Sequence, residues 1–96
     1  NTTISREGLV SSPRDIEQAG AGGLSGAPLR QRSLEVLGLL RGRLDPNLTV
    51  ISVGGISTSA DARERLDAGA TLLQAYTAFV YEGALWPSRV QRDLAG

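Results

Sequence analysis

The sequence predicts an α/β fold in which short parallel strands alternate with helices. A β-branched apolar run at residues 49–53 ends in the glycine pair Gly54-Gly55. A helical stretch follows, closes at Gly69, and leads into a second apolar run at residues 71–75. A helical crossover between two such runs makes the strands parallel neighbours. We therefore expect Gly54-Gly55 and the pair Tyr76-Thr77 at the carboxyl ends of adjacent strands, where α/β folds place their sites.

The composition limits the domain organisation and the chemistry. With 96 residues, 41% of them hydrophobic, the chain is long enough for one small domain and short enough to be part of a larger one. We expect a part, with exposed apolar surface, because a buried parallel sheet needs more than three short strands and no initiator Met is present. The zero formal charge favours neither nucleic acid nor an anionic membrane as a partner. Cysteine and histidine are absent, so we expect no disulfide and no metal site.

The first 29 residues are rich in polar residues and glycine. We interpret Asn1-Thr2-Thr3 as the carboxyl end of an upstream strand that faces a planar polar substrate, with a frayed terminus as the alternative. Residues 5–29 show no sustained period and predict a long glycine-rich loop, which in a compact domain is usually functional or mobile. Within it, residues 22–26 (GGLSG) offer backbone amides that can face an anion or a flat ring. A flexible connector is the alternative.

A helix is predicted from Pro28 to about Leu44, because proline suits a first turn and apolar residues recur at helical spacing. Its arginines are interpreted as a solvated face in preference to a phosphate clamp; they are Arg30, Arg32, Arg41 and Arg43. The turn at residues 45–47 then leads into the first strand.

The second half has clearer boundaries. Thr58 and Asp61 form the Thr-x-x-Asp pattern of a helix start, and Gly69 suits the residue that follows the helix end. Residues 78–81 are compatible with a helical turn or with an extension of the strand. Trp86 and Pro87 begin a last amphipathic helix, and core packing is the expected role of both Trp86 and Tyr81.

Two strand-end sites before a short terminal helix match the phosphate site of (β/α) barrels, which lies after strands 7 and 8. On this mapping Gly55 follows strand 7, and Tyr76-Thr77 follow strand 8. The amides of a helix N-terminus favour a phosphate dianion, and Thr77 is a further donor. This pattern predicts a phosphate-bearing ligand and leaves the reaction open.

Taken together, the motifs resemble the carboxyl-terminal portion of the quinone-linked (class 2) dihydroorotate dehydrogenase family. The resemblance covers essentially the whole chain. It depends on motifs in the family's order and at its approximate spacing, namely Asn1-Thr2-Thr3, GGLSG at residues 22–26 with Pro28-Leu29, Val53-Gly54-Gly55-Ile56, Ala68-Gly69-Ala70 and Gln74-Ala75-Tyr76-Thr77.

The resemblance implies a (β/α)8 TIM barrel that binds FMN and oxidises (S)-dihydroorotate to orotate in de novo pyrimidine (UMP) biosynthesis, with a quinone as electron acceptor. Asn1 and Thr2 match the family's substrate-binding positions. The matching cofactor-binding positions surround the flavin, mostly at its phosphate; they are Gly26, Gly55, Tyr76 and Thr77, with Gly54 assisting the turn. Residues 1–96 would then be one fragment of a single flavin-binding barrel domain.

Other parts of such an enzyme have no counterpart in the 96 residues. The resemblance implies a serine base and a flavin-contacting lysine upstream, and an amino-terminal helical extension that meets membrane and quinone. We therefore expect a soluble segment that is inactive alone, within a peripheral protein on the cytoplasmic side of the cell membrane. Glu82-Gly83 departs from the family's Gly-Pro and affects only the start of the last helix. Two alternatives are another phosphate-binding barrel enzyme and a small non-catalytic α/β module.

Overall fold

The computed structural model describes residues 2–96. Its elements follow one another along the chain as α1 (Pro13–Gln18), the 3-10 turn η1 (Ala27–Leu29), α2 (Arg30–Arg41), β1 (Ile51–Val53), α3 (Ser59–Asp67), β2 (Leu72–Gln74), α4 (Thr77–Glu82) and α5 (Trp86–Ala95). The helix–strand alternation predicted from residue 28 onward is confirmed.

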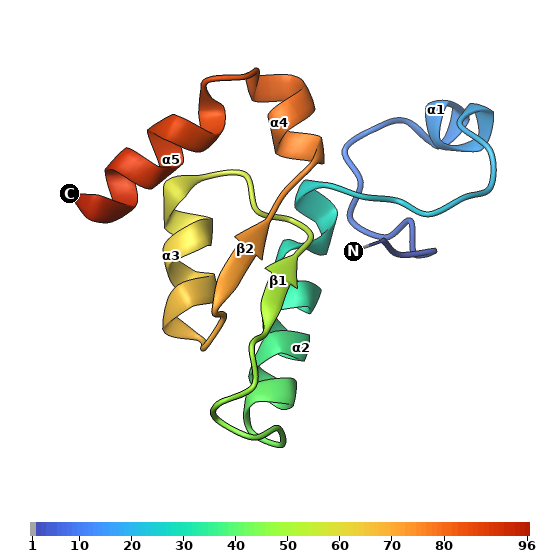
Figure 1. Cartoon of the computed structure of the whole chain (residues 1–96). Helices are drawn as coiled ribbons and strands as arrows, with labels where there is room; N and C mark the ends of the chain where they lie inside the picture. The colour runs from blue at the N-terminus through green and yellow to red at the C-terminus, as the bar shows by residue number, and fades with distance from the viewer. Residues whose placement is uncertain (1) are drawn as a thin grey trace.

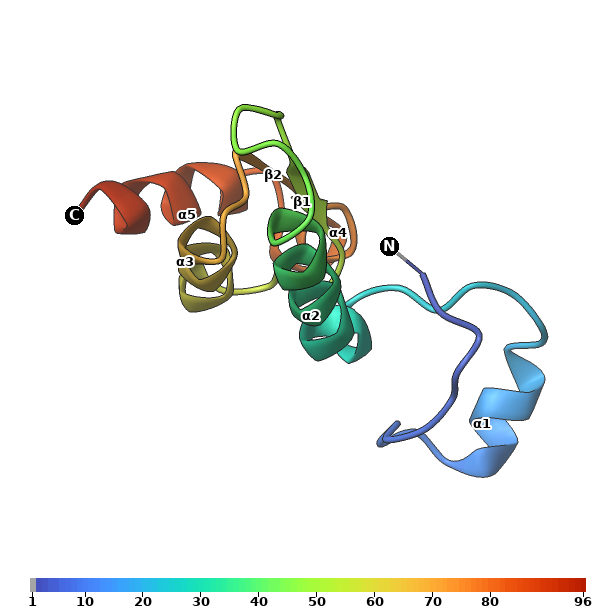
Figure 2. The same cartoon turned by 90° about the horizontal axis from the view of Figure 1, so that it is seen from below.

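The two strands form a parallel pair, with Ile51 opposite Leu72 and Val53 opposite Gln74. Helix α3 connects them, and α2 and α3 lie side by side against the strands (Figure 1). Figure 2 shows the same layers from below, with α5 packed across α3. The carboxyl ends of both strands therefore meet at one edge, which confirms the predicted strand-helix-strand unit.

Helix α3 begins and ends where the sequence predicts. The Thr58 hydroxyl accepts from the Asp61 amide at 3.1 Å, and the Asp61 carboxylate accepts from the Thr58 amide at 3.0 Å. This reciprocal capping box satisfies amides that have no partner within the helix. After Ala68, Gly69 takes a φ of 111°, a conformation that side chains disfavour, and the helix stops there.

Helix α2 buries Leu37 and follows a turn that buries Leu29, but it ends at Arg41, earlier than the predicted Leu44. The prediction of a solvated arginine face is wrong for two of its members. Arg30 donates to Asp61, and the Nε of Arg41 donates to the Gly69 carbonyl at 2.7 Å. Both side chains therefore fasten α2 to the strand-helix-strand unit.

The predicted loop at residues 5–29 contains a short helix, α1, which the sequence reading missed. Its start carries a signal: the Ser12 hydroxyl accepts from the Asp15 amide at 3.2 Å, and Pro13 stands at the first helical position. Ser12-x-x-Asp15 is thus the same kind of pattern that marks α3. The segment around α1 extends away from the rest of the chain in both views (Figures 1 and 2).

The described part of the amino-terminal triplet is paired. Thr3 and Leu24 form an antiparallel bridge, with amide-to-carbonyl distances of 2.9 and 2.8 Å in the two directions. The alternative of a frayed terminus therefore does not hold for Thr3. Because Thr3 belongs to the polar triplet and Leu24 to the GGLSG segment, this bridge joins two of the predicted motifs.

In the carboxyl-terminal part, two aromatic residues that were both predicted to pack in the core differ in burial. Trp86 is buried, and its indole Nε1 donates to the Ser57 carbonyl at 3.0 Å, as a core role requires. Tyr81 is 84% exposed, so its predicted core packing is wrong for this chain. Residues 78–81 belong to helix α4, because Gly83 at a φ of 88° stops the helix only after Glu82.

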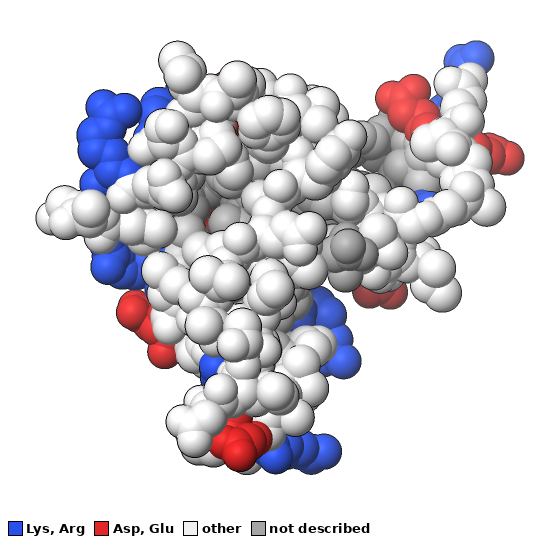
Figure 3. Space-filling view, viewed as in Figure 1, with Lys and Arg blue, Asp and Glu red and all other residues white. Residues whose placement is uncertain are grey.

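Both flanks of the two-stranded sheet are open and apolar, as predicted. Ile51 and Leu72, which lie opposite each other, are 52% and 56% exposed. The face seen in Figure 3 carries few charged side chains, and those visible gather at its margins. Within residues 2–96, no helix combines the length and the apolar character needed to cross a bilayer.

Candidate functional site

A cavity of about 240 Å³ lies at the carboxyl ends of β1 and β2. Its lining residues come from four segments: Thr2 in the amino-terminal arm, Ser25 and Gly26 at the end of the GGLSG segment, Val53–Ser57 at the end of β1, and Ala75–Ala78 after β2. The structure thus brings together all the predicted cofactor-binding residues, which are Gly26, Gly54, Gly55, Tyr76 and Thr77, with Thr2 beside them. The predicted site residue Asn1 lies outside the described residues.

The glycine turn after β1 has a shape that only glycine allows. Gly54 and Gly55 have φ values of 103° and 75°. A Cβ on Gly55 would lie 2.4 Å from the Arg30 amide nitrogen, which is backbone that a rotamer change cannot move. The Gly55 residue is buried, yet among residues 2–96 its amide has no hydrogen-bond partner. Buried backbone donors without partners are rare, so this amide is suited to a ligand in the cavity.

The GGLSG segment covers the cavity from the side of β2. The hydroxyls of Ser25 and Thr77 are 2.9 Å apart and share a hydrogen bond. Gly26 has a φ of 90°, and a Cβ there would approach the Thr77 methyl carbon at 3.0 Å. The loop and the end of β2 are therefore held together closely, with the Thr77 hydroxyl at the lining of the cavity.

The other end of this segment rests on the amino-terminal arm. A Cβ on Gly23 would lie 2.9 Å from Cβ and Oγ1 of Thr2, so these two segments of the chain are in contact. The Leu24 amide donates to the Thr3 carbonyl. This amide is consequently not available to a ligand, and the prediction of several ligand-facing amides in GGLSG does not hold for Leu24.

The amino terminus of α3 does not supply the anion-binding amides that the sequence led us to expect. The Asp61 carboxylate accepts from the amides of Ser57 and Thr58, at 3.0 Å each. These two amides directly precede the helix, and its first two residues, Ser59 and Ala60, do not line the strand-end cavity. The Asp61 carboxylate that marks the helix start in the sequence therefore occupies the amides of Ser57 and Thr58, which are not available to a ligand.

Asp61 also holds α2 in place. Its Oδ1 accepts from Arg30 Nε at 2.7 Å, and the carboxylate is mostly buried. Burial by itself raises the pKa of Asp61, but the bond from Arg30 and the two backbone amides outweigh it, so that the pKa lies below its ordinary value. The same bond to Asp61, with the charge of Glu64, raises the pKa of Arg30.

A buried arginine behind the glycine turn was not identified from the sequence. Arg65 is fully buried, and its guanidinium donates to two hydroxyls and two carbonyls, one of them on Gly54. One signal could have indicated it: Arg65 stands on the same helical face as Ala62, three residues earlier, and Ser52 is a lone hydroxyl within an apolar strand.

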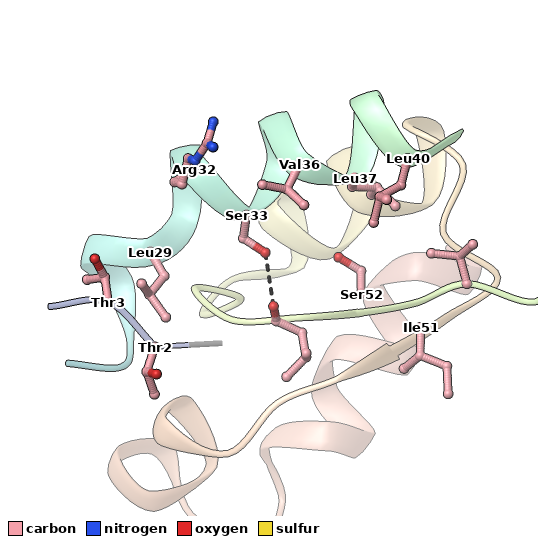
Figure 4. Close-up of a pocket in the computed structure, with 12 residues that line it drawn as sticks. Thr2, Thr3, Leu29, Arg32, Ser33, Val36, Leu37, Leu40, Ile51 and Ser52 are labelled. Carbon is pink, nitrogen blue, oxygen red and sulfur yellow. Dashed lines mark hydrogen bonds between the residues drawn. The ribbon is translucent and has the colours of Figure 1, made fainter. Parts of the chain in front are cut away.

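A second cavity, of about 440 Å³, lies between α2 and β1 and reaches Thr2 and Thr3 (Figure 4). Ser33 and Val53 both line this cavity, and the Ser33 hydroxyl donates to the Val53 carbonyl at 2.9 Å. A third, of about 600 Å³, lies beyond β2 against α3 and α5. These two cavities are the open flanks of the sheet, and apolar side chains line most of both.

The chemistry of the strand-end cavity is that of binding. Its lining offers hydroxyls, backbone amides and one phenol, and among the described residues no carboxylate, lysine or arginine side chain lines it. Such a set can hold a phosphate by hydrogen bonds, but it contains no side chain suited to take a proton at neutral pH. A general base for any reaction here has to come from outside the described lining.

Comparison with known proteins gives one consistent family. The family model described as dihydroorotate dehydrogenase matches residues 1–96. The chain is 61% identical to a dihydroorotate dehydrogenase (quinone) of Leifsonia xyli subsp. xyli and 63% identical to one of a Nocardioides species, over 99% of its own length and 28% and 27% of theirs. A ligand-free DHODH crystal structure from Eimeria tenella superposes with a TM-score of 0.85 at 34% identity, covering 98% of this chain and 25% of that one. The chain therefore spans about a quarter of the length of these relatives.

Proposed function

The chain belongs to the dihydroorotate dehydrogenase family, and we propose that it forms the carboxyl-terminal, flavin-phosphate part of an enzyme that oxidises (S)-dihydroorotate to orotate with a quinone as electron acceptor. The observation that carries this proposal is the strand-end cavity, which gathers Gly26, the glycine turn and Thr77 around the Gly55 amide, a donor without a partner among residues 2–96. Relatives named dihydroorotate dehydrogenase (quinone) support the choice of reaction and acceptor.

The residues present fit the phosphate end of FMN. Gly55 is buried and its amide donor has no partner among residues 2–96, and Thr77 lines the same cavity. The cavity holds no carboxylate among its described lining residues, so nothing there repels a dianion. Gly26 keeps its side of the cavity open to a ring, because a Cβ would fill the space next to Thr77.

When bound, FMN would supply the hydride chemistry that joins substrate oxidation to quinone reduction. The chain's own residues orient it: the Gly55 amide and the Thr77 hydroxyl bind phosphate, with Gly54 and Tyr76 shaping the same edge. Asn1 and Thr2 bind the substrate, and Thr2 lies at the rim of the described cavity. The proton acceptor is a residue upstream of this chain.

The family implies the wider architecture of a (β/α)8 barrel, and the open flanks support it. The cavities beside β1 and β2 are the places where neighbouring strands and helices of a (β/α)8 barrel would pack, and Ile51 and Leu72 would become buried there. Residues 1–96 would thus be a carboxyl-terminal fragment of one barrel domain, with residues 5–29 as a long glycine-rich loop within it. Membrane and quinone contact belongs to an amino-terminal region of a protein peripheral to the cytoplasmic side of the cell membrane.

The test is to purify the full-length protein that contains this chain and to identify its cofactor. We expect a yellow protein with a flavin absorbance spectrum, one FMN per chain by mass spectrometry after denaturation, and quinone-dependent oxidation of dihydroorotate. A full-length protein that is folded but binds no flavin from added FMN would refute the proposal.

Thr77→Val is expected to weaken FMN binding in the full-length enzyme by about tenfold, since a hydrogen bond to a charged group is typically worth that much. The loss in flavin retention should exceed the loss in turnover per bound flavin, because the hydroxyl faces phosphate and not the reacting ring. Ser25→Ala is the matched variant: it removes the bond to Thr77 but leaves the Thr77 hydroxyl in place. Equal FMN occupancy in Thr77→Val and wild type, measured by absorbance after gel filtration, would contradict this role.

A further inference from the structure

Arg65 occupies an unusual position for a cation. Its side chain is 0% exposed, and within residues 2–96 no ion pair involves it. Burial lowers the pKa of its guanidinium. A buried cation is costly unless hydrogen bonds satisfy it, and here four hydrogen bonds do so, with added attraction from the charges of Asp61 and Glu64.

The donors of Arg65 converge on the glycine turn and its supports. Nη1 donates to the hydroxyls of Ser33 and Ser52, at 2.9 and 3.0 Å. Nη2 donates to the carbonyls of Gly54 and Arg30, at 2.8 and 3.0 Å. One planar group therefore joins β1, the start of α2 and the turn that lines the strand-end cavity. An arginine fork can do this, whereas a lysine ammonium is a point donor.

The bond to Gly54 determines the direction of the next amide. The Gly54 carbonyl and the Gly55 amide belong to one planar trans peptide group, in which C=O and N–H point in opposite directions. Because Arg65 holds the carbonyl on its own side, the amide of Gly55 is directed away from Arg65. Gly55 is a buried residue at the cavity, and this amide has no hydrogen-bond partner among residues 2–96.

The bond from Arg65 to the Arg30 carbonyl holds the backbone against which the glycine turn packs. Arg30 and Gly55 approach so closely that a Cβ on Gly55 would lie within 2.5 Å of two Arg30 backbone atoms. With Arg65 bound to the carbonyls of both Arg30 and Gly54, neither side of this contact can rotate independently. The Gly55 peptide is consequently oriented before any ligand arrives.

We infer that Arg65 is a positioning residue that orients the Gly55 amide toward the cofactor phosphate and thereby sets the preference for a phosphorylated flavin. The inference depends on the proposed FMN site, and it assigns to Arg65 an action through the turn and not a contact with the ligand. Its distinguishing consequence is selectivity. FMN binding depends on the Gly55 peptide, whereas riboflavin, which lacks the phosphate, does not need it.

The experiment compares FMN and riboflavin binding to the full-length apoprotein by quenching of flavin fluorescence. Arg65→Met keeps a long side chain but removes all donors, and Arg65→Lys keeps the charge. Arg63→Met on the same helix is the matched control, because Arg63 is exposed and donates to the Leu94 carbonyl far from the turn. Circular dichroism and thermal unfolding report on folding in each variant.

We expect the ratio of the riboflavin Kd to the FMN Kd to fall about tenfold in Arg65→Met, the size of one lost bond to a charged group. It should fall less in Arg65→Lys and stay at the wild-type value in Arg63→Met. Equal weakening of both flavins, or an unchanged ratio, would overturn the inference, because a purely structural role affects both ligands alike.

The experiment also decides the inference if Arg65→Met does not fold, or if the wild-type apoprotein binds no flavin. If Arg65→Met does not fold, Arg65→Lys decides: a severalfold lower ratio supports the inference and a wild-type ratio overturns it. If wild-type apoprotein binds neither flavin, the proposed function fails, and the inference fails with it. A wild type that prefers FMN, together with an unchanged ratio in the Arg65 variants, refutes the inference alone.

Discussion

Gly55→Ala in the full-length protein is expected to abolish flavin retention and to lower the free energy of unfolding by about 2–5 kcal/mol. The φ of 75° disfavours any side chain, and the new Cβ would lie 2.4 Å from the Arg30 amide nitrogen. Both atoms of that contact are tied to the backbone, so relief requires the turn to move away from α2. Such a movement displaces the Gly55 amide from the cavity.

Gly83→Ala separates the effect of a positive φ from the effect of a close contact with neighbouring backbone. Gly83 has a φ of 88°, but a Cβ there would meet no atom within 4 Å. We expect it to cost only the conformational part, about 1–2 kcal/mol, and to leave flavin content unchanged. The measurements are the flavin-to-protein absorbance ratio and thermal unfolding. Equal stability and equal flavin content in the two variants would show that close packing at Gly55 has no importance.

Asp61→Ala should destabilise the full-length protein by about 2–3 kcal/mol, because it removes a helix cap and a mostly buried acceptor of three hydrogen bonds together. The amides of Ser57 and Thr58 and the Nε of Arg30 all lose this partner. Asp67→Ala is the matched control, since Asp67 is exposed at the end of the same helix, and its effect should be close to zero. Denaturant unfolding of both variants at pH 7 measures the difference.

The pH dependence of Asp61 follows from the direction of its pKa shift. A carboxyl whose pKa is lower in the folded state than its ordinary 3.8 stabilises the fold fully above that value and loses this contribution as the pH falls through the folded-state pKa. The stability gap between wild type and Asp61→Asn should therefore be constant from pH 7 to 5 and should narrow below pH 3.8. A gap that is constant down to pH 3 would show that the Asp61 charge contributes nothing.

The predictions that held depend on short-range signals. Thr58 and Asp61 are three positions apart and cap one helix, and Gly69 ends it, so neighbouring residues suffice to place α3. The α1 helix carries the same kind of signal in Ser12 and Asp15, and it was missed because surrounding glycines dominated the reading of that segment. Helix boundaries of this type are encoded by capping residues a few positions apart.

The errors at single residues have a different origin. Tyr81 is exposed although tyrosine has an apolar body, because its burial depends on partners that residues 2–96 do not provide. Arg30 and Arg41 occupy the expected outer positions of α2, yet each reaches a partner 28 or more positions along the chain. Helical spacing places a side chain on a face, but it does not identify what packs against that face.

The sequence by itself indicated the family, through the resemblance of its motifs. It also determined the strand-helix-strand order and the residues that would meet at the strand ends, since glycine conformations, caps and parallel crossovers follow from local residue types. Only the tertiary structure decided how that site is supported. Ser25 reaches Thr77 across 52 positions, and Arg65 reaches the carbonyls of Gly54 and Arg30. Every residue has a carbonyl, so no residue type in the sequence marks the two carbonyls that Arg65 binds, and its role at the glycine turn emerges only when the chain is folded.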